Sequence, residues 1–230
     1  MSGILYLVAT PIGNLKDITL RALEILKEVS YIVCEDTRRT KILLDHYQIK
    51  KPLISYNEHN KFNKTPEIIQ LLKKGESLAF VSDAGTPVIS DPGYYLVREV
   101  IKEGIKISPI PGPAAMIAGL IVSGLPSDRF AFEGFLPKRE GRKRKKLLNL
   151  VNEERTMVFY ESPYRIMRTL NTFLEIFGDR EIALCRELTK KFEEVLRGKI
   201  SEIIEILKKR LEKQERIKGE IVLIVKGKEE

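Results

Sequence analysis

The 230-residue sequence is poor in the residues that hold metals and disulfides. It has two cysteines, Cys34 and Cys185, which lie far apart and form no C-x-x-C pair, and two histidines, His46 and His59. These numbers argue against a disulfide framework, a thiolate metal site and a histidine-based zinc or iron site, so no metal is expected. The glycine patterns G-x-G-x-x-G and G-x-x-x-x-G-K-[ST] do not occur, which removes the best support for a dinucleotide or nucleoside triphosphate as ligand.

Long hydrophobic runs are also missing. The first apolar run has no basic segment of the kind that begins a signal peptide, and Pro11 ends it early. The other long apolar stretch, residues 114–125, is interrupted by glycine and falls short of the roughly 20 residues needed to span a bilayer. A hydrophobic share of 43% is nevertheless typical of a packed globular core. We therefore expect a cytoplasmic globular protein.

Short apolar runs alternate with segments of helical periodicity. In the first half, strands are expected at residues 4–9, 31–34, 53–56, 78–81 and 105–110, with helices between them. This alternation predicts an α/β domain with a largely parallel sheet. After Pro111-Gly-Pro113, some expected strands follow one another without a helix, which predicts a second α/β domain with some antiparallel pairing. The expected domains are residues 1–112 and 113–230, with a cleft between them.

The loop at residues 81–93, Val-Ser-Asp-Ala-Gly-Thr-Pro-Val-Ile-Ser-Asp-Pro-Gly, follows one expected strand and precedes a helix. Open α/β sheets bind ligands at this end of their strands. Its glycines allow a ligand to approach the backbone, its prolines stiffen the loop, and Asp83 and Asp91 supply hydrogen-bond acceptors. An ordinary long turn is the alternative. Residues 10–17 and 111–115 are weak signals alone, but the three loops together predict the lining of a cleft.

The net charge of +8 is concentrated in one segment. Residues 138–146, K-R-E-G-R-K-R-K-K, contain seven basic residues and one acid. Such a run is commonly a solvated segment. The alternative is a phosphate-contacting loop or helix start, where release of counterions supplies affinity without sequence specificity.

Seven stretches carry a resemblance to a known family. They are LYLVATPIGNLKDIT at residues 5–19, CEDTR at 34–38, the 81–93 loop, LPSDRFAFEGFLP at 125–137, YES at 160–162, RELTK at 186–190 and GEIVLIV at 219–225. In this order they resemble the ribosomal RNA small-subunit methyltransferase I family, a branch of the tetrapyrrole methylase superfamily. The resemblance implies two α/β domains, a homodimer and S-adenosylmethionine in the interdomain cleft. It also implies 2′-O-methylation of a cytidine in the decoding region of 16S rRNA.

Carried over to the matching positions, the resemblance implies a set of cofactor-binding residues. They are Pro11, Asp83, Gly85, Val88, Ser90, Pro111, Ala114, Ala115, Tyr160, Glu161, Leu188, Gly219 and Glu220. Many contacts in the superfamily are made by backbone, so the side chains at several of these positions are only loosely informative. Val88 and Leu188 could equally be core residues.

Methyl transfer from a sulfonium is an in-line displacement that needs positioning and no metal. A ribose hydroxyl becomes a good nucleophile when a nearby group takes its proton. The candidates for that group are Asp36, Glu58 and His59, with Glu35 beside them; an ion-pair cluster and a surface histidine are the alternative interpretations.

Phosphate contacts are expected from a further set of cations. They are Arg38, Arg39, Lys138, Arg139, Arg142, Lys143 and Arg144. The basic run directly follows Pro137, near the expected mouth of the cleft, which favours a role in binding RNA.

Two other functions remain open. One is a tetrapyrrole methylase with an acidic macrocycle as acceptor, and the other is an RNA-binding module without catalysis. The first loop lacks the glycine-rich sequence of the tetrapyrrole-modifying branch, which favours the RNA branch. Two departures stand out: Tyr164 replaces a histidine common in relatives, and the helical C-terminal extension of many relatives does not follow the last strand. Any RNA affinity that the extension supplies in relatives is expected to come from elsewhere here, or to be lost.

Overall fold

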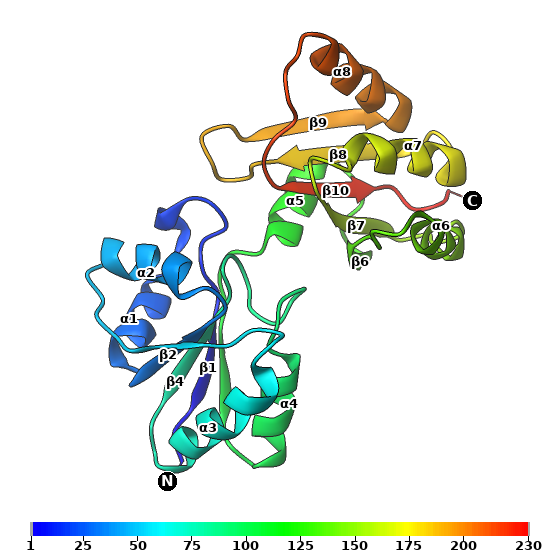
Figure 1. Ribbon diagram of the computed structural model, residues 1–230. Helices are drawn as coiled ribbons and strands as arrows, with labels where there is room; N and C mark the ends of the chain where they lie inside the picture. The colour runs from blue at the N-terminus through cyan, green and yellow to red at the C-terminus, as the bar shows by residue number, and fades with distance from the viewer. Residues whose placement is uncertain (1, 230) are drawn as a thin grey trace. The chain divides into compact units, whose positions relative to one another are not determined.

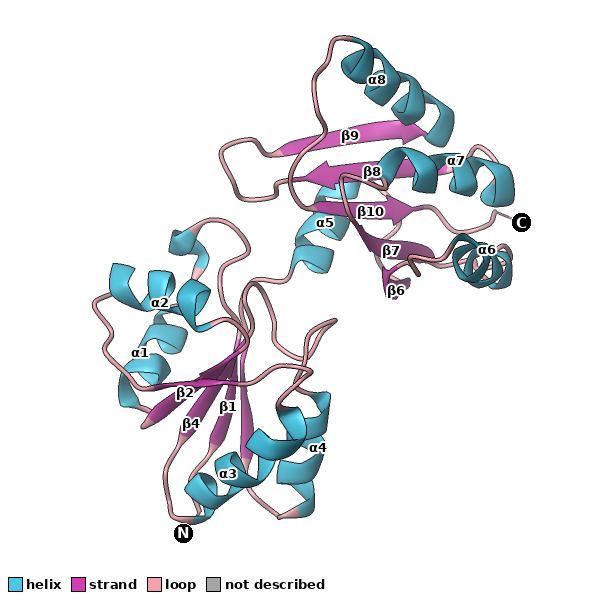
Figure 2. Ribbon diagram, viewed as in Figure 1, coloured by secondary structure: helices cyan, strands magenta, loops and turns pink. Residues whose placement is uncertain are grey.

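The computed structural model describes residues 2–229, which fall into two compact units divided between Ala114 and Ala115. Unit 1 is the part up to Ala114 and unit 2 the part from Ala115. Strands and helices alternate in both units, so the predicted α/β class is confirmed (Figure 2). Within residues 2–229, none of the helices has the length and apolar character required to cross a membrane.

Unit 1 is built on a parallel sheet of five strands in the order β3-β2-β4-β1-β5. The strands are β1 (Leu5–Val8), β2 (Tyr31–Cys34), β3 (Leu53–Ser55), β4 (Leu78–Val81) and β5 (Ile107–Ile110). Neighbouring strands all run in the same direction, as predicted. The carboxyl ends of all five strands therefore lie along one edge, which we call the carboxyl edge.

Four helices cover the two faces of this sheet. They are α1 (Leu20–Glu28), α2 (Thr37–His46), α3 (Lys61–Lys73) and α4 (Tyr94–Lys102), preceded by a short 3-10 helix, η1 (Leu15–Asp17). Helices α1 and α2 lie on one face, and α3 and α4 on the other (Figure 1). The hydroxyl of Thr19 accepts the Ala22 N–H and fixes the start of α1.

The carboxyl ends of β1 and β4 form the switch point of the sheet, where the connections leave neighbouring strands on opposite faces. From β1 the chain passes to α1 on one face, and from the neighbouring β4 it passes to α4 on the other. Thr10 and Gly85 join the two loops there by exchanging backbone hydrogen bonds of 2.9 and 3.0 Å. Open α/β sheets bind ligands at such switch points.

Unit 2 has a mixed sheet of five strands in the order β6-β7-β10-β8-β9. The strands are β6 (Phe130–Phe135), β7 (Thr156–Glu161), β8 (Glu181–Arg186), β9 (Glu194–Lys199) and β10 (Ile221–Val225). Strands β6 and β7 are parallel and the other neighbours antiparallel, which confirms the predicted antiparallel pairing.

The helices of unit 2 pack on both faces of its sheet. They are α5 (Ala115–Ser123), α6 (Glu140–Asn149), α7 (Ile166–Phe177) and α8 (Ile200–Glu212). Helices α6, α7 and α8 share one apolar core with alternate residues of the strands, such as Leu223. Helix α5 lies on the opposite face, where a Cβ on Gly119 would come within 3.1 Å of the Val222 and Ile224 side chains.

Candidate functional site

A small pocket lies at the carboxyl edge of unit 1. Its volume of about 190 Å³ has room for roughly six water molecules. It is lined by the loop after β1, the first turns of α2 and the end of β4: Thr10, Pro11, Leu15, Arg39, Thr40, Ile42, Leu43, Val81, Ser82 and Asp83. The pocket thus brings together two predicted cofactor-binding residues, Pro11 and Asp83, and one predicted RNA-binding residue, Arg39.

Asp83 connects the end of β4 to the start of α2. One carboxylate oxygen accepts the backbone N–H of Asp36 at 3.1 Å, and the other lies 3.6 Å from the guanidinium of Arg39. Asp83 therefore holds the start of α2 in place and also lines the pocket. Its side chain is about a quarter exposed.

The loop after β4 is held in an unusual backbone conformation. Gly85, Val88, Ser90 and Gly93 all have positive φ angles, of 83°, 74°, 62° and 142°. A positive φ is rare for a β-branched residue such as Val88 and costs about 1–3 kcal/mol. Strain of this kind clusters at ligand clamps and active sites. Three of the four residues, Gly85, Val88 and Ser90, are predicted cofactor-binding positions.

Three carboxylates near this loop and the end of β2 influence one another. Burial raises the pKa of Asp91 to about 6, and the charges of Glu35 and Asp83 add to the effect. Burial and the Asp83 charge also raise the pKa of Glu35. A carboxylate that titrates near neutral pH is suited to taking a proton, and such groups gather at functional sites. Sequence reasoning named Asp91 only as a hydrogen-bond acceptor, because its burial comes from the folding of the loop.

The structure gives Asp36 a role different from the predicted proton acceptor. Its carboxylate caps α2 by accepting the Arg38 N–H at 2.9 Å and also binds the Arg38 guanidinium at 2.7 and 3.0 Å. These hydrogen bonds lower the pKa of Asp36 to about 2. Asp36 is therefore a weaker base than an unpaired carboxylate, and its partners are those of a helix cap; its role as proton acceptor stays a prediction.

The other two predicted catalytic residues lie on an exposed turn after β3. Glu58 forms an ion pair of 2.5 Å with Lys61, and the backbone N–H of His59 donates to the Asn57 side chain. Both side chains are open to solvent. Their assignment as proton acceptors stays a prediction.

Asp91 gives a testable pH dependence of stability. Because the folded pKa is raised above the usual value, the folded chain holds this proton more tightly between about pH 4 and about pH 6, and its stability falls as the pH rises through that window. We expect Asp91→Asn to be about 1 kcal/mol more stable than the parent near neutral pH, after allowance for solvent screening, and equally stable near pH 4. Urea unfolding at both pH values measures this. An identical difference at both would contradict it.

In unit 2, the loop that follows β8 meets the loop that precedes β10. Glu187 accepts the backbone N–H of Glu220 and the Lys190 ammonium, both at 2.9 Å, and Lys190 also pairs with Glu220 at 3.0 Å. Gly219 has a φ of 94°, and a Cβ there would lie 2.4 Å from the Glu187 side chain. The predicted cofactor-binding residues Leu188, Gly219 and Glu220 are therefore neighbours in space.

This second loop is also strained. Glu187 and Thr189 have φ angles of 52° and 67°, on either side of the buried Leu188. The hydroxyl of Thr189 is buried and has no hydrogen-bond partner among residues 2–229. A buried polar atom without a partner calls for an explanation, and a polar ligand beside Leu188 would supply one.

Glu161, a predicted cofactor-binding residue, is occupied inside unit 2. Its side chain is 0% exposed and forms an ion pair of 2.6 Å with Arg165. It also accepts the Ser162 N–H at 2.7 Å and the Thr169 hydroxyl at 2.6 Å. The carboxylate is thus structural, and only the backbone of Glu161 is left for a ligand. Tyr160 precedes it on β7, with its ring against Phe132 and Phe135.

The remaining predicted cofactor positions follow β5. Pro111 is exposed, while Ala114 and Ala115 are half-buried, and Ala115 begins α5. A Cβ on the neighbouring Gly112 would lie 3.0 Å from the Ala9 Cβ, so the chain passes close to the end of β1.

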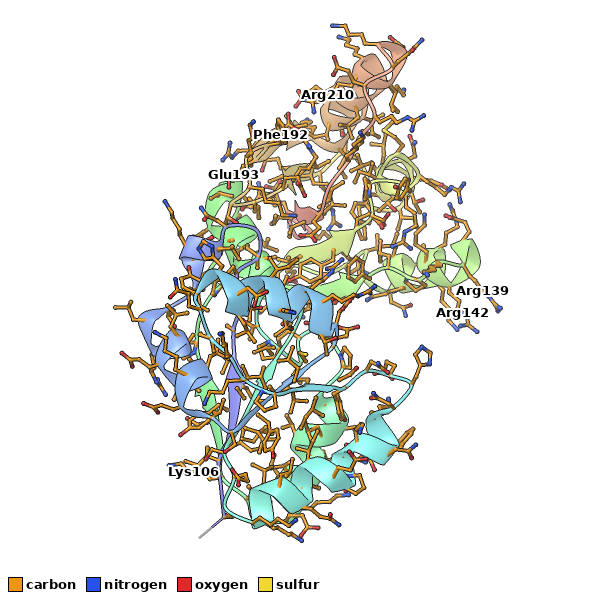
Figure 3. The ribbon with its side chains drawn as sticks, turned by 60° about the vertical axis from the view of Figure 1, so that its left-hand side comes forward. Lys106, Arg139, Arg142, Phe192, Glu193 and Arg210 are labelled. Atoms are coloured by element: carbon orange, nitrogen blue, oxygen red, sulfur yellow. The ribbon has the colours of Figure 1, made fainter. Side chains whose placement is uncertain are left out.

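The basic run forms α6 and the two residues before it, and its cations differ in their surroundings. Lys143 is 4% exposed and paired with Glu140. Its ammonium is therefore not available to RNA, contrary to the prediction. Arg144 and Lys146 are paired with Glu175 and Glu133. Four exposed cations form no ion pair within residues 2–229: Lys138, Arg139, Arg142 and Lys145. Arg139 and Arg142 project outward from the helix (Figure 3). Lys145 is an addition to the predicted set.

A family model described as tetrapyrrole (corrin/porphyrin) methylases matches residues 4–204. Among solved structures, uroporphyrin-III-C-methyltransferase from Thermus thermophilus gives a TM-score of 0.65 at 20% identity, covering 97% of this chain and 94% of that chain. Diphthine synthase gives a TM-score of 0.70 at 13% identity, covering 97% and 90%. At these identities the likeness concerns the fold. Fold and family model together define a protein of the tetrapyrrole methylase class.

Closer relatives narrow the class. Proteins named ribosomal RNA small subunit methyltransferase I are 52% identical in Thermotoga maritima, 49% in Haemophilus influenzae and 48% in Bacillus subtilis. The matches cover 98–99% of this chain and 100%, 80% and 75% of those proteins. The chain belongs to the ribosomal RNA small subunit methyltransferase I family. In the described part of the chain, no group of three or more His, Cys, Asp or Glu side chains could hold a metal ion.

Proposed function

We propose that this protein transfers a methyl group from S-adenosylmethionine to the ribose 2′-hydroxyl of a cytidine in the decoding region of 16S rRNA. The observation that carries the proposal is the identity of about half of the residues, over nearly the whole chain, with relatives named for small-subunit rRNA methylation. The predicted domains 1–112 and 113–230, a cytoplasmic location and a homodimer are part of the same proposal.

The methyl donor is proposed to contact loops of both units, among them the strained loops after β4 and β8. In unit 1 these are the loops carrying Pro11, Asp83, Gly85, Val88 and Ser90, with Pro111 and Ala114 after β5. In unit 2 they carry Ala115, Tyr160, the backbone of Glu161, Leu188, Gly219 and Glu220. The positive φ angles on both loops and the buried, unpartnered Thr189 hydroxyl support this assignment. The bound donor supplies an activated methyl group with its own leaving group.

The chain's own residues then have to position the ribose hydroxyl and take its proton. Holding the oxygen in line with the methyl carbon removes several kcal/mol from the barrier. For the proton we favour Asp91, because its pKa of about 6 leaves it ionised at neutral pH but more basic than an exposed carboxylate. Glu58, His59 and Asp36 remain candidates, with the Asp36 carboxylate held as the cap of α2.

One experiment tests the reaction. The protein is incubated with radiolabelled S-adenosylmethionine and small ribosomal subunits, and the labelled nucleotide is mapped. We expect label on one ribose of 16S rRNA. Label on a base, or label transferred to a tetrapyrrole and not to RNA, would overturn the proposal.

RNA is proposed to dock chiefly on α6, with a smaller contribution from Arg38 and Arg39, which are paired with Asp36 and Asp83. Four cations on α6 and just before it have no acidic partner within residues 2–229, and we call Lys138, Arg139, Arg142 and Lys145 the free α6 cations. Cations already neutralised by Glu140, Glu175 and Glu133 release little counterion on binding phosphate. Affinity is therefore assigned to part of the basic run only.

Replacing the free α6 cations together by glutamine should lower affinity for 16S rRNA roughly tenfold or more. The slope of log affinity against log salt should fall by roughly 3, since each lost phosphate contact removes about 0.7–0.9. Filter binding over a range of salt concentrations measures both. Cofactor affinity should not change.

A matched control removes the same charge elsewhere. Lys27, Lys50, Lys74 and Lys106 are exposed, and each precedes a strand at the opposite edge of the unit 1 sheet; Lys106 is labelled in Figure 3. Their replacement by glutamine should leave most of the RNA affinity. Equal losses in the two variants would mean that only net charge matters.

A further inference from the structure

Unit 2 carries a groove that the proposed donor and RNA surfaces do not use. Its volume is about 480 Å³, and it lies between the start of α7 and the segment that follows α8. Met167, Leu211 and Ile217 supply apolar lining, and Tyr164 supplies an aromatic wall. Arg216 and Lys218 complete it. We call it the Tyr164 groove.

Tyr164 is an exposed aromatic residue on a rigid turn. The residue is 95% exposed, so its side chain contributes little to the core. The preceding proline restricts the backbone, and the Tyr164 N–H donates to the Ser162 hydroxyl at 3.3 Å. Arg165 beside it is tied to Glu161 and to the carbonyl of Leu136. Because the backbone of this turn is already ordered, stacking of the exposed ring on a ligand costs little backbone entropy.

The charge of the groove favours an anion. Its lining includes two cations, Arg216 and Lys218, and no acid. Neither cation forms an ion pair with another residue of the described range 2–229. The nearby carboxylate of Glu220 is already paired with Lys190. The backbone carbonyl of Lys218 accepts the Arg186 guanidinium at 3.3 Å, which anchors the cationic side of the groove.

An aromatic ring, an apolar floor and two free cations together match one ligand chemistry, an unpaired nucleotide. Proteins that bind single-stranded nucleic acid stack bases on aromatic side chains and hold the phosphates with cations. The groove also adjoins the proposed donor loops in the sequence, because Lys218 precedes Gly219 and Tyr164 follows Glu161 by three residues. We propose that the Tyr164 groove binds an unpaired nucleotide of the substrate RNA, with its base on the Tyr164 ring and its phosphate on Arg216 and Lys218. The proposal rests on the rRNA methyltransferase function proposed above.

The sequence contains no tryptophan, which makes a direct test possible. In the variant Tyr164→Trp the single indole reports on stacking, and a short single-stranded oligouridylate should quench its fluorescence. A control reporter, Ile101→Trp, sits at an exposed position near the end of α4 in unit 1 and should not be quenched. No quenching at position 164, or equal quenching in both variants, would overturn the proposal.

Affinity measurements complete the test. Tyr164→Ala should weaken binding of 16S rRNA about 5- to 150-fold, the range found for loss of one stacked base, while Tyr164→Phe should retain parental affinity. Because the side chain is exposed, neither change should affect unfolding. If Tyr164→Ala binds RNA as the parent does while the parent still labels 16S rRNA, the groove is wrong and the methyltransferase function stands. If the indole is quenched but the parent labels no RNA, the function is wrong and the groove stands.

Discussion

Arg165→Leu should lower the free energy of unfolding by about 3–5 kcal/mol, the cost of leaving a buried charge without its partner. The Glu161 carboxylate is fully buried, and Arg165 is the cation that neutralises it, at 2.6 Å. The substitution also removes the hydrogen bond from Arg165 to the Leu136 carbonyl. Urea unfolding followed by circular dichroism measures the loss.

Two further variants separate charge from packing. In the double variant Glu161→Gln with Arg165→Leu, the neutral amide can still bond to Thr169, so we expect a large part of the lost stability to return. The exposed pair between Arg144 and Glu175 in the same unit is the matched control, and Arg144→Leu should cost less than about 1 kcal/mol. If the double variant is as unstable as Arg165→Leu alone, the loss comes from packing and not from the unpaired charge.

Glu161 also shows where sequence reasoning reached its limit. The motif Tyr160-Glu161-Ser162 marks a loop at the end of β7, and a resemblance assigns that loop to the cofactor. The sequence does not reveal that the carboxylate turns inward, because its partner Thr169 is supplied by the packing of α7 against the sheet. Backbone and side chain of one residue thus serve different purposes, and only the structure separates them.

The strands were the most predictable part of the fold. Each is a short apolar run bounded by turn residues. Because helices cover both faces of each sheet, successive residues of a strand are buried and apolar, as in Ile221–Val225. The order of the strands could not be predicted, since β4 enters between β2 and β1 through contacts distant in sequence. The short η1 helix was also missed, because the loop after β1 has no apolar periodicity to announce it.

The basic run was identified, but its division into free and paired cations was not. Lys143 and Leu147 are four residues apart and both buried, so they lie on the inward face of α6. That spacing is visible in the sequence once a helix is assumed. The acidic partners of Arg144 and Lys146 come from α7 and β6, which only the tertiary structure brings near. The same holds for Asp91, whose raised pKa depends on burial by its own loop.

Gly93→Ala should cost about 2–5 kcal/mol of stability and weaken the binding of S-adenosylmethionine at least tenfold. Gly93 directly precedes α4 and has a φ of 142°, and an added Cβ would lie 2.6 Å from the ring of Phe80 and 3.1 Å from Val88. Phe80 is 2% exposed and packs edge-on against Tyr56, so it has little room to move. Overpacking costs about 1–3 kcal/mol and a positive φ for alanine about 1–2 kcal/mol more.

Gly104→Ala is the matched control, because Gly104 has a φ of 65° in the same unit but nothing within 4 Å of an added Cβ. This variant should lose about 1–2 kcal/mol from backbone strain alone and keep its affinity for the donor. Calorimetric titration with S-adenosylmethionine, together with urea unfolding, distinguishes the two. Equal stability losses would show that Phe80 gives way easily. A destabilised Gly93→Ala variant with parental donor affinity would remove the strained loop after β4, with Val88 and Ser90, from the donor site, since any shift at Gly93 is passed directly to these neighbours.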